Sequence, residues 1–127
     1  MKQILLIDKD PVFTSTISSI LARENFIVRV AKDGKEAAGA LSEKVFDLVI
    51  TDVFMSFANG FELVSNIRQN ESTRHTPVIV ISDIANELSI AHCMRAGADA
   101  YLKKPFNISQ LLSGIKNLVR NEKNVAA

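Results

Sequence analysis

Polar and charged side chains directly follow four short apolar runs of this sequence. They are Asp8, Lys9 and Asp10 after the first run, Asp52 after the third, Ser82 and Asp83 after the fourth, and Lys103, Lys104 and Pro105 after the fifth. One such residue alone usually marks a chain leaving the core. Carboxylates, a hydroxyl and an ammonium at one place are the groups that bind and accept a phosphoryl group, with or without Mg²⁺.

This set of residue types predicts transfer of a phosphoryl group to a carboxylate. A carboxylate attacks phosphorus weakly unless the charge on the phosphoryl oxygens is neutralised, which a divalent cation and a lysine can do. A hydroxyl can then hold one of these oxygens. Carboxylates that lie together also repel one another, and they therefore favour a hard cation such as Mg²⁺, which prefers oxygen ligands.

The apolar runs themselves predict the strands of a parallel sheet. Four of them are rich in valine and isoleucine without polar alternation, as expected of strands that helices cover on both faces. Segments with apolar residues at helical spacing lie between them. The expected strands are Ile4–Ile7, Phe26–Val30, Leu48–Thr51, Val78–Ile81 and Ala100–Leu102.

Helix boundary residues support this alternation. Asp10 can cap the first helix, Gly97 can end the fourth, and Asn107 or Ser109 can cap the fifth. Because the crossovers between parallel strands are right-handed, five βα units predict an α/β fold, a doubly wound five-stranded parallel sheet in three α/β/α layers. Ligands of such sheets bind at the carboxyl ends of the strands, where the polar residues gather.

Composition predicts one globular domain and excludes several classes of protein. The 127 residues are 47% hydrophobic and 23% charged, which suits a single core. The formal net charge of +1 argues against direct nucleic-acid binding, and the apolar start is too short for a signal sequence or a membrane span. We therefore expect a cytoplasmic protein without membrane contact. The domain is expected over residues 1–121, with residues 122–127 as a frayed tail.

The order and spacing of these residues resemble the receiver domain of two-component response regulators. Residues 48–63 are similar to the acceptor segment of that family, with Asp52 followed by Met55, then by Asn59-Gly60 and Glu62-Leu63. Residues 4–11 and 97–106 resemble its first and fifth strand motifs. The resemblance covers essentially the whole chain and implies a flavodoxin-like fold.

The resemblance also implies a role for each matching residue. It makes Asp52 the phospho-acceptor, Lys104 and Ser82 the phosphate-binding residues, Asp8 and Asp10 the acidic pocket, Ser82 and Tyr101 the switch pair, and Asp8, Asp52 and the main-chain carbonyl of Phe54 the ligands of Mg²⁺. It further implies a cis peptide bond between Lys104 and Pro105.

One departure from the family pattern concerns the metal. Lys9 stands where the family usually has a second acidic residue that binds the metal directly, so we expect weak Mg²⁺ binding. Because neighbouring carboxylates require a counter-charge, we expect the Lys9 ammonium to contact Asp8, Asp10 or Asp52. The alternative is that the flexible Lys9 side chain extends into water.

Three further residues are expected to modify the pocket. Asp83 follows Ser82 where a small residue is common, and it adds negative charge beside the pocket. Phe54 and Ile84 occupy the positions that tune the phosphoryl lifetime in the family. Neither side chain can orient a water molecule, which predicts a long-lived phosphoryl group on Asp52.

The resemblance and the departure at Lys9 together leave two candidate functions of different classes. The first is a phosphorylation switch, in which a sensor histidine kinase or phosphotransfer protein donates to Asp52. The fourth helix, fifth strand and fifth helix, including residues 86–95 and 109–120, would then act on an output protein or on a module outside this chain. The second is a pseudo-receiver, an interaction module with weak or no Mg²⁺-dependent phosphorylation because of Lys9.

A flavodoxin-like enzyme or cofactor carrier is disfavoured, since the sequence has neither a glycine-rich phosphate loop nor a nucleophile elbow. A receiver is no enzyme beyond catalysing its own phosphorylation and dephosphorylation. The pattern predicts no particular oligomeric state.

Overall fold

Strands and helices alternate along the chain in the computed structural model, which describes residues 1–53, 60–84 and 86–126. The strands are β1 (Gln3–Ile7), β2 (Ile27–Ala31), β3 (Leu48–Asp52), β4 (Val78–Ser82) and β5 (Ala100–Lys103). The helices are α1 (Pro11–Arg23), α2 (Gly34–Glu43), α3 (Gly60–Gln69), α4 (Glu87–Ala96) and α5 (Ile108–Ala126). Each predicted strand is present and differs from the prediction by at most one residue at either end.

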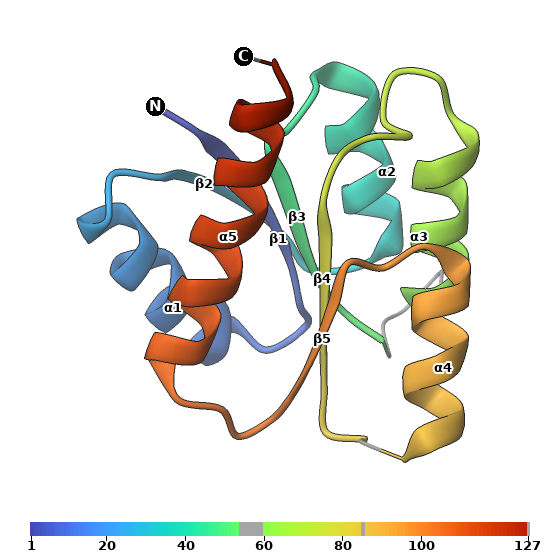
Figure 1. Ribbon diagram of the computed structural model, residues 1–127. Coiled ribbons are helices and arrows are strands. Elements are labelled where there is room, and N and C mark those ends of the chain that lie inside the picture. The colour runs from blue at the N-terminus through green and yellow to red at the C-terminus, as the bar shows by residue number, and fades with distance from the viewer. Residues whose placement is uncertain (54–59, 85, 127) are drawn as a thin grey trace.

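The five strands form one parallel sheet in the order β2-β1-β3-β4-β5. Leu5 of β1 pairs with Val49 of β3, and Val49 pairs with Val78 of β4, so these three strands lie at the centre. The carboxyl ends of all strands point to the same edge, at the bottom of Figure 1. This topology confirms the predicted doubly wound α/β fold, and the strand order reverses between β1 and β3.

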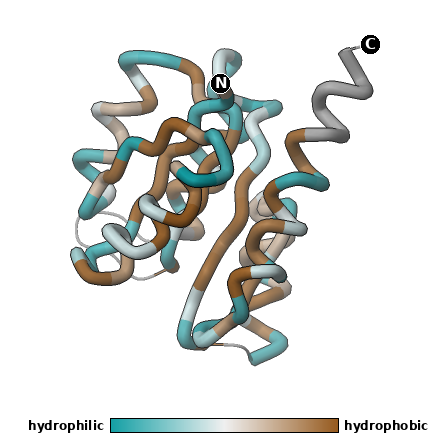
Figure 2. Tube along the Cα trace, turned by 90° about the vertical axis from the view of Figure 1, so that its left-hand side faces the viewer, coloured by the Kyte–Doolittle hydropathy of each residue, from teal (hydrophilic) through white to brown (hydrophobic). Residues whose placement is uncertain are grey.

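Alternate residues of the strands face two separate cores. Helices α1 and α5 cover one face of the sheet, and α2, α3 and α4 cover the other (Figure 1). Leu6 and Ile50 belong to the core beneath α1 and α5, whereas Leu5 and Val49 belong to the opposite core, and all four are fully buried. Figure 2 shows hydrophobic residues along the strands and hydrophilic residues at the connecting turns. Burial on both faces explains why the central strands β1, β3 and β4 lack polar alternation, whereas β2 and β5 at the edges are partly exposed.

The predicted helix boundaries agree with the structure in most details. The Asp10 carboxylate accepts hydrogen bonds from the first turn of α1, and Pro11 begins that helix. Asn107 rather than Ser109 caps α5, since its side-chain oxygen accepts the Gln110 N–H at 2.9 Å. Helix α5 continues to Ala126, so the expected tail is helical over most of its length. The domain boundary at residue 121 stays a prediction.

Two further features agree with the sequence. The peptide bond between Lys104 and Pro105 is cis, as the resemblance implied. None of the helices in the described part of the chain has the length and apolar character that a membrane crossing requires.

Gly97 ends α4 in a conformation that side-chain-bearing residues rarely adopt, with φ of 120°. A Cβ atom on Gly97 would lie 2.6 Å from Cγ of Arg68. Arg68 has little room to move, because its guanidinium donates hydrogen bonds to the carbonyls of Gly97 and Thr76 and forms an ion pair with Asp99 at 2.8 Å. These contacts fix the carboxyl end of α4 against the strands.

Gly97→Ala is therefore expected to lower the free energy of unfolding by roughly 2 kcal/mol, through backbone strain and the clash with Arg68. Urea denaturation measures this difference. Gly39→Ala is the matched control, since a Cβ at that position of α2 meets nothing within 4 Å. We expect it to stabilise slightly, as alanine does in helices. Equal stability of the two variants would contradict the argument.

Candidate functional site

Three predicted site residues meet at the carboxyl edge of the sheet. Asp8 directly follows β1, Asp52 ends β3, and Lys104 directly follows β5. The Lys104 ammonium lies 2.8 Å from Oδ2 of Asp8 and 3.7 Å from Oδ2 of Asp52. One cation thus joins the carboxylates of two adjacent strands, at the point where the strand order reverses.

Both carboxylates are buried, since Asp8 is 2% exposed and Asp52 is 8% exposed. Buried carboxylates are costly unless they receive hydrogen bonds or a counter-charge. The second oxygen of Asp8 accepts the main-chain N–H of Asp10 at 2.9 Å, so both of its oxygens are bound. Oδ1 of Asp52 accepts the N–H of Val53 at 2.6 Å. Asp52 is the more exposed of the two and lies farther from Lys104.

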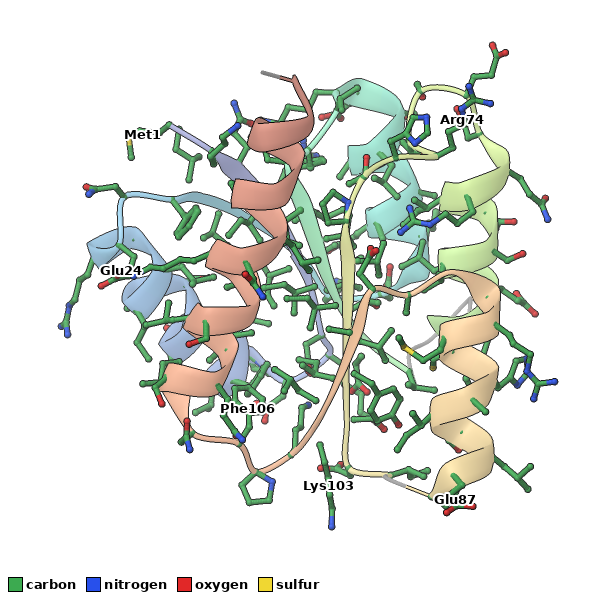
Figure 3. The ribbon with its side chains drawn as sticks, in the orientation of Figure 1. Met1, Glu24, Arg74, Glu87, Lys103 and Phe106 are labelled. Carbon is green, nitrogen blue, oxygen red and sulfur yellow. The ribbon has the colours of Figure 1, made fainter. Side chains whose placement is uncertain are left out.

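The Lys104 ammonium is held by an aromatic ring as well as by carboxylates. It lies 4.3 Å from the centroid of the Phe13 ring, within the range of a cation–π contact. Burial alone would lower the pKa of Lys104, but the hydrogen bond to Asp8 and the charges of Asp52, Asp8 and Asp83 outweigh it and raise this pKa. Lys104 is therefore cationic at neutral pH. The neighbouring Lys103 points away from the sheet edge (Figure 3).

Ser82 and Tyr101 both bind the main chain of Ile84. Ser82 is fully buried at the end of β4, and its hydroxyl oxygen accepts the Ile84 N–H at 3.1 Å. The Tyr101 hydroxyl donates to the carbonyl of the same residue. The predicted switch pair is thus connected through one residue, and the Ser82 hydroxyl proton can still be donated to another acceptor.

Two predicted residues lie differently from expectation. Lys9 is exposed, and within residues 1–53, 60–84 and 86–126 no ion pair joins it to an acidic side chain. The predicted contact of Lys9 with Asp8, Asp10 or Asp52 is therefore wrong, because Lys104 supplies the counter-charge and the Lys9 side chain is free to extend into water. Asp10 is also exposed. Its carboxylate caps α1, and its main-chain N–H is the group that binds Asp8.

Comparison with known proteins identifies the family. Residues 4–116 match the family model of the response regulator receiver domain. The chain belongs to this family. It is 39% identical to the transcriptional regulatory protein CpxR of Klebsiella pneumoniae over 120 residues, which are 94% of this chain and 50% of CpxR. The chain thus spans about half the length of the curated relatives it matches.

Solved receiver structures share the fold. A CheY-like receiver domain protein of Methanospirillum hungatei has a TM-score of 0.91 and 26% identity, with 98% of each chain covered. The receiver domain of the sensor histidine kinase PA1611 of Pseudomonas aeruginosa has a TM-score of 0.85 and 25% identity, covering 93% of this chain and 97% of that one. That structure holds a magnesium ion coordinated in its active-site cleft. Receivers are signalling domains rather than enzymes of the usual kind.

Two carboxylates of the predicted metal site, Asp8 and Asp52, lie together in the described part of the chain. In the described ranges, no group of three or more His, Cys, Asp or Glu side chains is placed to hold a metal ion. Asp8 and Asp52 supply two carboxylates of the type that Mg²⁺ prefers. Phe54, whose carbonyl was expected to complete the site, lies outside the described residues.

Asp83, one of the predicted pocket modifiers, and Phe13, which was not predicted to take part in the site, lie beside Lys104. Asp83 is exposed, and it lines an apolar groove of about 500 Å³ together with Lys104, Phe13 and Phe106. Phe13 is an apolar residue of α1, and its residue type alone indicates no more than helix packing. Its position in the first turn of α1, directly after the acidic segment, was the available signal that its ring lies near the strand ends.

Proposed function

We propose that this receiver domain is a phosphorylation switch in which Asp52 accepts a phosphoryl group from a histidine kinase or a phosphotransfer protein. The observation that carries the proposal is the Lys104 ammonium shared between two buried carboxylates. Such an ammonium can neutralise the charge that spreads over the phosphoryl oxygens during transfer.

The contacts favour Asp52 over Asp8 as the acceptor. Asp8 uses one oxygen for Lys104 at 2.8 Å and the other for a main-chain N–H. Asp52 is held less closely by Lys104, at 3.7 Å. In the proposed step an oxygen of Asp52 attacks phosphorus, the P–N bond to the donor histidine breaks, and its electron pair returns to the imidazole. The Ser82 hydroxyl donates a hydrogen bond to one phosphoryl oxygen.

Mg²⁺ is the proposed cofactor, and we expect it to bind weakly. Asp8 and Asp52 would hold it, with the main-chain carbonyl of Phe54. When bound, Mg²⁺ would add charge neutralisation at the phosphoryl oxygens to that of Lys104. The magnesium ion in the PA1611 receiver supports this assignment. Lys9 supplies no carboxylate at the adjacent position, which limits the charge available to the metal.

Output through α4, β5 and α5 is supported by the connection at Ile84. If the Ser82 hydroxyl turns to a phosphoryl oxygen, its contact with the Ile84 N–H changes, and the Ile84 carbonyl also binds Tyr101. A charge at Asp52 can thus alter the segment that begins α4. The recipient is proposed to be an output protein or a module outside this chain, because relatives described as transcriptional regulatory proteins are about twice as long. A cytoplasmic location is part of the proposal.

A pseudo-receiver is the second candidate. Lys9 in place of an acidic residue favours it, and so does the balance of Asp8 and Asp52 by Lys104 without any metal. Such a module would bind its partner in one constitutive form.

Intact-mass measurement after incubation with acetyl phosphate and Mg²⁺ separates the two candidates. The wild type is expected to gain the mass of one phosphoryl group, and Asp52→Asn is expected to gain none. Thermal unfolding of Asp52→Asn checks that the variant is folded. A wild type that stays unmodified by acetyl phosphate, phosphoramidate and a phosphorylated histidine kinase would overturn the switch and leave the pseudo-receiver.

The phosphoryl group on Asp52 is expected to be long-lived, because Phe54 and Ile84 cannot orient an attacking water molecule. Replacing both residues with asparagine should speed hydrolysis by roughly tenfold, since a polar side chain can position water for attack. The decay of the phosphorylated mass after removal of the donor measures this rate. Ile84→Leu is the apolar control and should leave it unchanged. An unchanged or slower decay in the asparagine variant would count against the argument.

A further inference from the structure

Strands β4 and β5 bring a third carboxylate to Lys104. Ser82 pairs in register with Lys103, and the Lys104 N–H donates to the Ser82 carbonyl at 2.8 Å. The residue after Ser82 is Asp83, which therefore lies beside Lys104 at the carboxyl edge of the sheet. Both side chains line the same groove.

Asp83 differs from the other two carboxylates in its exposure and its contacts. Asp8 and Asp52 are buried and form ion pairs with Lys104. Asp83 is exposed, and among the described residues its side chain has neither a hydrogen bond nor an ion pair. Its charge nevertheless reaches Lys104, because it is one of the charges that raise the pKa of that lysine. One ammonium thus faces three carboxylates, and Asp83 is the exposed one.

We propose that Asp83 is a specificity-determining residue, which slows phosphorylation by small donors in proportion to their negative charge and thereby favours a protein donor. The proposal rests on Asp52 being the acceptor. A small dianion that approaches Lys104 meets the exposed Asp83 carboxylate in the same groove, and like charges repel over several ångströms. A protein donor can neutralise Asp83 with a basic side chain next to its phosphohistidine. Asp83 would then attract the correct partner while it repels small anions.

Two small donors of different charge test this proposal directly. Acetyl phosphate is a dianion at neutral pH, whereas phosphoramidate is mainly a monoanion. Asp83→Asn is expected to raise the Asp52 phosphorylation rate about tenfold with acetyl phosphate and clearly less with phosphoramidate. Asp83→Glu, which keeps the charge, should behave like the wild type. Added salt should speed the wild type with acetyl phosphate and narrow its gap to Asp83→Asn, because salt screens exposed charges.

Glu87→Gln is the matched control. It removes the same charge from an exposed position in the first turn of α4 and is expected to leave the ratio of the two donor rates unchanged. Asp52→Asn is treated with the same donors in parallel. If it gains no phosphoryl mass, the product measured in the other variants is assigned to Asp52.

The possible failures are distinguishable. Asp52 could be phosphorylated while Asp83→Asn changes the rates with the two donors by the same factor, or changes neither rate. Asp83 then does not discriminate between donors by charge, and the switch function still stands. If Asp83→Asn lowers the rate together with Mg²⁺ affinity, Asp83 is a metal ligand instead and the inference is overturned. If neither the wild type nor Asp83→Asn is phosphorylated by any donor, the switch function fails and this inference fails with it.

Discussion

Lys104→Met is expected to slow phosphorylation of Asp52 by about 10²–10³-fold, the usual effect of removing one group that stabilises transition-state charge. The same substitution should destabilise the domain. Methionine keeps an apolar side chain beside Phe13 but removes the ammonium that lies over the Phe13 ring and 2.8 Å from Asp8. The Asp8 side chain, only 1% exposed, would then be buried without its counter-charge.

The expected loss of stability is roughly 1–3 kcal/mol, below the usual cost of breaking a buried pair because Lys104 is partly exposed. Urea denaturation and intact-mass kinetics measure the two effects. Lys103→Met is the control, since that side chain is exposed and points away from the site (Figure 3). Adding Asp8→Asn to Lys104→Met should restore part of the stability, by removing the unpaired charge. A Lys104→Met variant with wild-type stability and rate would refute the role of Lys104.

Lys9→Asp is expected to raise Mg²⁺ affinity and the Asp52 phosphorylation rate by at least roughly tenfold each, because it replaces a positive charge with a carboxylate beside the pocket. Lys9 is exposed and has no ion pair with an acidic side chain in the described part of the chain, so the substitution breaks no such contact. The new carboxylate would follow Asp8 directly, next to the two carboxylates that Lys104 already joins.

Lys9→Ala separates the two components of this effect. It removes the positive charge without adding a ligand, so we expect a smaller gain in affinity than with Lys9→Asp. Calorimetric titration with Mg²⁺ measures the affinity, and phosphorylation with acetyl phosphate measures the rate. If Lys9→Asp leaves both values at the wild-type level, Lys9 does not limit this site.

The fold could be predicted from the sequence because local pattern and global packing agree. Helices on both faces of the sheet require strands that are apolar on both sides, and runs such as Leu48–Thr51 and Val78–Ile81 have this composition. The capping carboxylate of Asp10 and the glycine at position 97 marked helix ends that the structure contains. Helix α5 extends beyond the expected end, since the segment after residue 121 has no proline or glycine to stop it.

The site could be predicted less completely. Strand ends placed Asp8, Asp52 and Lys104 together, because parallel strands end at the same edge. Lys9 and Lys104 both lie near these carboxylates in the sequence pattern, and residue types do not reveal which side chain points toward them. In the structure Lys104 makes the contact. The connection between Ser82 and Tyr101 through Ile84 could not be predicted either. It uses the main-chain N–H and carbonyl of Ile84, and every residue except proline has both groups.

Tyr101 is the single tyrosine of the chain, and the chain has no tryptophan. Ultraviolet emission excited in the tyrosine band therefore comes from one ring, whose hydroxyl is bound to the Ile84 carbonyl. That carbonyl belongs to the residue whose N–H is bound by Ser82. The protein thus contains a natural fluorophore linked through Ile84 to its proposed phosphorylation site. Any event that exchanges the hydrogen-bond partner of this phenol changes the brightness of the unlabelled protein, so the proposed switch can be tested in real time without an attached dye.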